Sequence, residues 1–165
     1  MSFRLRAEAG DWFKGIETKD GPIRTMFDQY YLCLMLGLAT GRNERFPGAP
    51  EFVDYFVTDF SAVARLLVAL LVIAEAKRLG VELADKGDVK RLLDDYLDPN
   101  HPANLTDQGF QKLNDYANGG FSELVEAVPE RPRHVETFLQ IYTALIADKM
   151  NNSDIWARYT EGASA

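Results

Sequence analysis

Apolar residues recur at steps of three and four along most of this chain, and this spacing is typical of helices that bury one face. The pattern is clearest between residues 23 and 39, and it returns in segments 89–97, 107–117 and 133–150. No alternation of strands with helices appears, which argues against a parallel α/β sheet. We therefore expect an all-α protein, a single-domain orthogonal helical bundle of six or seven helices.

Residues that favour helix ends divide this pattern into segments. Gly41 is well placed to stop the helix that begins after Pro22, and Thr106 is suited to cap the helix that follows it. Asn118-Gly119-Gly120 predicts the end of that helix, with a separate short helix from Ser122 to Val128. The aromatic residues between 52 and 59 indicate another short helix.

The two ends of the chain are expected to differ from the bundle between them. Phe3, Leu5 and Ala7 alternate with polar residues, so the first 20 residues fit an extended N-terminal arm followed by a short helix. We expect residues 1–160 to form the single helical domain and residues 161–165 to form a flexible C-terminal tail.

The longest apolar run, LLVALLVIA at residues 66–74, is too short to cross a membrane. A membrane-spanning helix needs about 20 apolar residues. The run is therefore expected to be a buried central helix of the bundle, and we predict no association with a membrane.

The chain has 165 residues and a formal net charge of −7, and the negative charge is unevenly spread. Residues 1–46 carry seven basic and six acidic side chains, so the acidic excess lies in the remainder. An acidic surface disfavours non-specific binding to nucleic acid. A DNA-backbone-contacting accessory subunit of a nucleic-acid-handling system is our alternative hypothesis, and it would use Arg4, Arg6, Lys14, Lys19, Arg24, Arg42 and Arg45.

Signatures of catalysis are missing from the sequence. No serine lies in a GxSxG elbow, and neither GxxxxGK[ST] nor GxGxxG occurs. The single cysteine, Cys33, lies between two leucines, which is typical of a buried structural thiol. It favours a reducing compartment, and with no secretion signal in view we expect a cytoplasmic protein. We predict no cofactor and favour a protein that is not an enzyme.

One cluster could hold a divalent metal ion. Asp94 and Asp98 are four residues apart and share a helix face, and His101 follows in a turn. Carboxylates with an imidazole can bind Mg²⁺ or Mn²⁺, so a metal-dependent hydrolase is the weakest of our hypotheses.

Aromatic residues near both termini favour a binding function. They lie in segments too short to form stable helices alone, so they must pack on the chain's own core or on a partner. Our first hypothesis is a non-catalytic helical interaction or assembly subunit of a multi-protein complex, with a protein partner or a second copy of the chain docking on these residues and on the proline-rich loops 46–50 and 129–132. The predicted contact residues are Trp12, Phe13, Phe46, Ile155, Trp156 and Tyr159.

Overall fold

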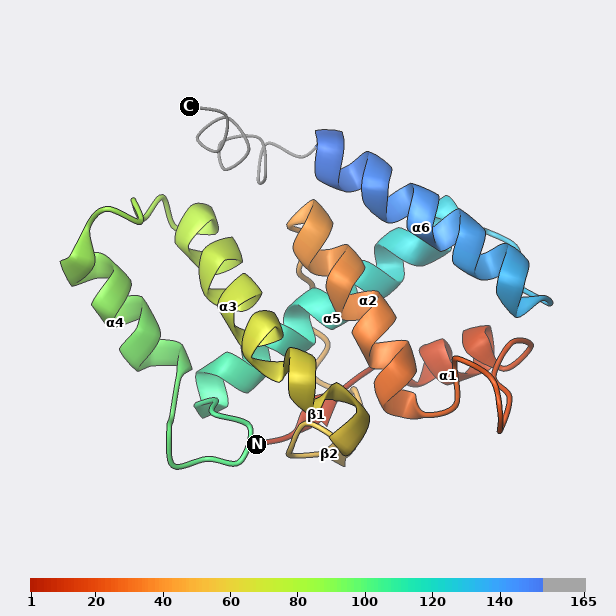
Figure 1. Cartoon of the computed structure of the whole chain (residues 1–165), viewed down its shortest axis with the longest axis horizontal. Helices are drawn as coiled ribbons and strands as arrows, with labels where there is room; N and C mark the ends of the chain where they lie inside the picture. The colour runs from red at the N-terminus through yellow and green to blue at the C-terminus, as the bar shows by residue number, and fades with distance from the viewer. Residues whose placement is uncertain (153–165) are drawn as a thin grey trace.

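A computed structural model describes residues 1–152 and contains six α-helices, one 3-10 helix (η1) and a two-stranded sheet (Figure 1). The prediction of an all-α bundle with six or seven helices is confirmed. The predicted tail, residues 161–165, lies outside the described residues. In chain order the elements are β1 (Phe3–Arg4), α1 (Ala7–Phe13), α2 (Met26–Thr40), β2 (Glu51–Val53), η1 (Thr58–Phe60), α3 (Ser61–Arg78), α4 (Lys86–Tyr96), α5 (Asp107–Ala127) and α6 (Val135–Asn152).

The ends of α2 and the start of α5 follow from local side-chain chemistry. Thr25 and Asp28 form a capping box at the start of α2, in which each side chain accepts a hydrogen bond from the other residue's backbone N–H. Gly41 ends α2 with a left-handed backbone (φ 73°), as predicted. Thr106 caps α5 by accepting a hydrogen bond from the Gly109 N–H, also as predicted.

Helices α2 and α5 cross at the centre of the molecule, with their backbones in direct contact (Figure 1). A Cβ atom on Gly37 would collide with the carbonyl oxygen of Tyr116. A Cβ atom on Gly120 would collide with the carbonyl oxygen of Cys33. Glycine is required at both positions because any side chain would force the two helices apart.

The predicted helix break at Gly119-Gly120 is therefore wrong. Helix α5 runs without interruption from Asp107 to Ala127, and the segment predicted as a separate short helix is its last turns. Both glycines are needed for close approach, since Gly119 lies against the backbone of Arg42 just as Gly120 lies against α2. Packing against distant backbone outweighs the intrinsic cost of about 1 kcal/mol for a glycine inside a helix.

The N-terminal arm is extended over its first residues and forms part of the core. β1 pairs antiparallel with β2, with Phe3 opposite Val53. The Phe3 ring is fully buried, and its centroid lies 5.0 Å from that of Phe110 and 5.2 Å from that of Phe27. Residues 52–59 were expected to be helical, but they form β2, a bend and the start of η1, because β2 is the strand that pairs with the arm.

Helix α3 is not the buried centre of the bundle that its apolar run predicts. It lies beside the α2–α5 pair, next to α4, while α6 lies on the other side of α2 (Figure 1). Leu71 and Ala74 face the core, but Leu66 is 56% exposed. Among the described residues, no helix has both the length and the apolar character needed to cross a membrane.

We predict that Gly120→Ala lowers the free energy of unfolding by about 3 kcal/mol, because the new methyl group overlaps the α2 backbone. Urea denaturation measures the change. The matched control is Gly10→Ala in α1, where a Cβ atom meets nothing within 4 Å. The control should be neutral or stabilise the protein by up to about 1 kcal/mol. Equal effects of the two substitutions would contradict a backbone contact at the crossing.

Candidate functional site

The N-terminal aromatic residues predicted to bind a partner are buried within the domain. Trp12 is 4% exposed and Phe13 is fully buried, and both rings stack edge-on against Phe138 of α6. Phe46 is half-buried and lies 4.9 Å beneath the Arg6 guanidinium. Ile155, Trp156 and Tyr159 lie outside the described residues. Trp12 and Phe13 thus contribute to the core, the other outcome considered for them.

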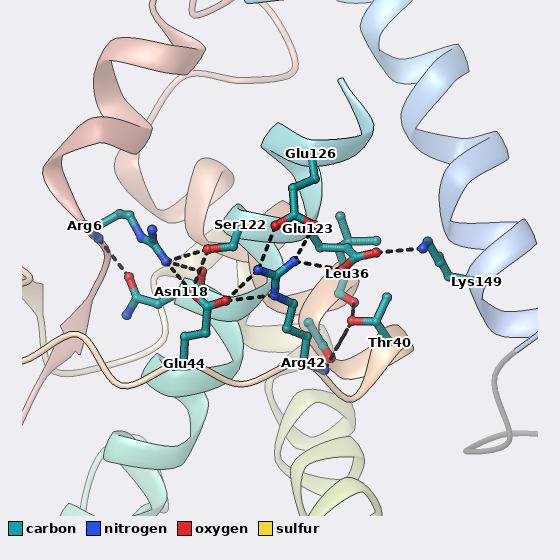
Figure 2. Close-up of polar contacts among 11 residues, drawn as sticks. Arg6, Leu36, Thr40, Arg42, Glu44, Asn118, Ser122, Glu123, Glu126 and Lys149 are labelled. Atoms are coloured by element: carbon teal, nitrogen blue, oxygen red, sulfur yellow. Dashed lines mark hydrogen bonds and ion pairs between the residues drawn. The ribbon is translucent and has the colours of Figure 1, made fainter. Parts of the chain in front are cut away.

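Two of the arginines predicted to contact nucleic acid are held in a network of ion pairs on α5 (Figure 2). Arg42 contacts Glu44 at 2.8 Å, Glu126 at 2.8 Å and Glu123 at 3.2 Å. Arg6 donates to Glu44 at 3.0 Å. Lys149 of α6 pairs with Glu123 at 2.6 Å, and Ser122 donates to Glu44 at 2.6 Å. Three cations thus meet three carboxylates, which leaves little net charge to attract a phosphate backbone.

The other predicted nucleic-acid contacts are scattered over the surface. Arg4 pairs with Glu51, and Arg24 pairs with Asp59 at 2.8 Å. Within the described part of the chain, Lys14, Lys19 and Arg45 form no ion pair within 4.0 Å. The seven residues therefore form no continuous basic patch.

Lys14 does lie near two arginines that are distant in the sequence. Together with Arg131 and Arg133 it lines a cleft of about 630 Å³ between α1 and the loop before α6. Asp11 and Glu130 line the same cleft and offset most of this positive charge. The cleft does not carry the strong basic charge typical of a nucleic-acid surface.

The predicted metal ligands each have a local partner. Asp94 pairs with Lys90 at 2.6 Å. Asp98 accepts a hydrogen bond from the backbone N–H of Asn100, and His101 Nδ1 accepts one from the backbone N–H of Ala103. Within residues 1–152, no group of three or more histidine, cysteine, aspartate or glutamate side chains is arranged to hold a metal ion.

A buried carboxylate joins α3, α4 and α5. Glu75 is fully buried and accepts hydrogen bonds from the hydroxyls of Tyr96 at 2.7 Å and Tyr116 at 2.9 Å. Arg78 contacts both of its oxygens, at 2.8 and 2.7 Å. Burial alone would raise the pKa of Glu75, but these hydrogen bonds outweigh it and hold the pKa below its ordinary value. The two tyrosine hydroxyls join α4 and α5 to α3 through Glu75, and Arg78 of α3 supplies its remaining hydrogen bonds.

One face of α3 is apolar and open to solvent. Ala62, Leu66 and Ala69 are exposed, and Leu70 and Ile73 are half-buried. Their spacing of three and four residues gives a continuous stripe, which we call the α3 stripe. A helix with apolar residues on both faces is normally buried on both. The α3 stripe is therefore a candidate surface for a partner.

An apolar recess of about 470 Å³ adjoins the beginning of α3. Phe60, the last residue of η1, forms part of its wall and directly precedes α3. The remaining apolar wall comes from the first turn of α2, β2 and the segment before η1, namely Met26, Phe27, Phe52, Val53 and Val57. The recess meets α3 only at Phe60, and no residue of the α3 stripe lines it.

This surface was not predicted from the sequence, because the whole apolar run at residues 66–74 was expected to lie in the core. The sequence does contain a signal of this exposed face, since residues 62–73 include almost no polar residue that could face solvent.

Comparisons with protein-family models, curated proteins and solved structures find no significant match to this chain. Its own contacts and exposed surfaces therefore carry the functional inference.

We predict that Glu75→Gln destabilises the protein most at neutral pH and progressively less as the pH falls. A carboxylate whose pKa is depressed by folding stabilises the native state above its unfolded pKa, and that contribution disappears as the pH falls through the folded pKa. Thermal unfolding from neutral to acidic pH measures the difference. The control is Glu130→Gln, at an exposed carboxylate, which should leave the stability unchanged. A pH-independent effect of Glu75→Gln would contradict a charged role for Glu75.

Proposed function

We propose that this protein is a non-catalytic helical assembly subunit that binds an amphipathic helix of a protein partner along the α3 stripe. The observation that carries the proposal is the exposure of Leu66, at 56%, within a continuous apolar helix face. Burying such a face against a second helix is the usual way for a helix-binding protein to gain affinity. Because a fully buried leucine contributes about 1.5–3 kcal/mol, a few such residues suffice for stable binding.

The size of the side chains supports a helix as the occupant. Ala62 and Ala69 alternate with Leu66 along the stripe, so a facing helix can approach closely and pack its ridges between them. The adjoining recess at Phe60 can take one large apolar side chain of the partner. Such an anchor in a pocket is typical of the residues that dominate binding energy.

The charge of the chain favours a different protein over a second copy. Two copies would each carry a formal net charge of −7 and would repel one another. Arg65, an exposed cation on α3 with no ion pair among the described residues, cannot offset that excess. We therefore expect a partner helix with basic residues flanking its apolar face.

Site-specific photo-crosslinking tests the proposal. A photoreactive amino acid replaces Leu66 in the full chain, expressed in the cells that produce it, and the crosslinked peptide is identified by mass spectrometry. We expect one discrete product, in which the crosslinked peptide is an amphipathic helix of another protein. Ala69→Glu, which adds a charge to the stripe, should reduce this product by at least about tenfold.

The matched control puts the same photoreactive amino acid at Leu93, an exposed leucine on α4 outside the stripe. If position 66 gives no more product than position 93, the α3 stripe is not a docking surface and the proposal is wrong. Products made only with a second copy of the chain would replace the proposed partner with a homo-oligomer.

A further inference from the structure

A small pocket separate from the α3 stripe lies where the N-terminal arm meets α5. It measures about 160 Å³ and is closed on one side by Phe46 and Pro47 of the loop after α2. Its polar wall comes from one face of α5 and from two arginines, Arg4 on the arm and Arg45 beside Phe46. Residues from three distant parts of the chain therefore meet around one cavity.

Two asparagines in the wall of the pocket have structural roles. The Asn114 side chain accepts hydrogen bonds from the backbone N–H of Arg4 at 2.9 Å and from the Tyr30 hydroxyl at 3.1 Å. It donates one to the backbone carbonyl of Ser2. The Asn118 side chain accepts a hydrogen bond from the backbone N–H of Arg6 at 3.1 Å. These bonds fasten the arm to α5 and hold that side of the pocket in place.

Asp115, between them in sequence, has no comparable role. It is 6% exposed, yet its carboxylate accepts no hydrogen bond from the described residues. Its one ion-pair contact is with Lys112, whose Nζ atom is 3.9 Å from Oδ2. Burial raises the pKa of Asp115 above its ordinary value. Its carboxylate oxygens are not among the buried polar atoms that lack a partner in the described residues, so they reach the open space of the pocket and can accept a hydrogen bond from a ligand.

The same pocket holds unused hydrogen-bond donors. Arg45 is exposed and forms no ion pair within the described residues, although its positive charge is close enough to act on Asp115. Arg4 pairs with Glu51 through Nη2, while its Nε–H is buried and has no hydrogen-bond partner. Guanidinium groups with free N–H donors are suited to bind a carboxylate.

We propose that this pocket binds a small zwitterion of the α-amino-acid class, with its ammonium group on Asp115 and its carboxylate on Arg45 and the Nε–H of Arg4. One ligand of this kind would donate hydrogen bonds to the Asp115 carboxylate and accept them from Arg45 and from the Nε–H of Arg4. A cation alone would leave Arg45 without a partner in the described residues, whereas Arg4 already pairs with Glu51, and an anion alone would face the carboxylate of Asp115.

The size of the pocket limits the ligand. Its volume exceeds the roughly 30 Å³ of one water molecule and falls below the roughly 300 Å³ at which drug-sized sites begin. A free amino acid with a short or medium side chain fits this range. Phe46 and Pro47 offer an apolar surface to such a side chain.

Isothermal titration calorimetry of the full chain with each common L-α-amino acid in turn tests the proposal. We expect at least one to bind, and neither the amine nor the carboxylic acid with the same side chain to match it. Asp115→Asn and Arg45→Ala should each weaken binding by about 10- to 100-fold, because each removes a charged hydrogen-bond partner. The matched control is Asp95→Asn, which removes the same charge at an exposed aspartate of α4 and should bind as the wild type does.

Thermal unfolding separates a binding role for Asp115 from a structural one. In the absence of ligand, Asp115→Asn should unfold at the same temperature as the wild type or higher, because it removes a desolvated charge. A lower unfolding temperature with unchanged binding would overturn the proposal, and so would a wild-type chain that binds no amino acid. These outcomes leave the α3 stripe untouched, since Asp115 lies on α5.

Discussion

The direct contact between the backbones of α2 and α5 sets the geometry of this protein. Glycines at 37, 119 and 120 remove the side chains that would otherwise separate α5 from the backbone it packs against. Close contact between backbones buries peptide groups and small residues, so larger apolar side chains are left to fill space around the pair. Cys33, whose carbonyl meets Gly120, is buried, and burial raises the pKa of its thiol. It is thus a packing residue.

The remaining faces of α5 organise the rest of the molecule. One carries Asn114 and Asn118, which bind the backbone of the N-terminal arm and bring Phe3 into the core. The same arrangement creates the pocket around Asp115. Another face carries Glu123 and Glu126, which form ion pairs with Arg42 of the loop after α2. Glu123 also pairs with Lys149 of α6 (Figure 2). Helix α5 is therefore the scaffold for the N-terminal arm, the ion-pair network and the pocket around Asp115.

Charged groups in this acidic chain fall into two kinds. Most arginines of the N-terminal quarter lie beside glutamates or aspartates, so they stabilise the fold locally and do not form a basic surface. Asp115 and Arg45 differ, because each lacks a strong partner within the described residues. The proposed binding functions rest on two places, the apolar surface exposed along the α3 stripe and the weakly paired charges of the pocket around Asp115.

Local chemistry was enough to predict some features of the fold. Helix stripes and capping residues such as Thr106 and Gly41 depend on neighbours within a few residues, so the class of fold and several helix ends followed from the sequence alone. Gly119-Gly120 was misread because the reason for these glycines is the backbone of Cys33 and Arg42, far away in the chain. Contacts between distant segments determine which apolar face of α3 is covered and which arginines are paired. They also place Asp115 in the wall of a pocket. Only the tertiary structure decided these features.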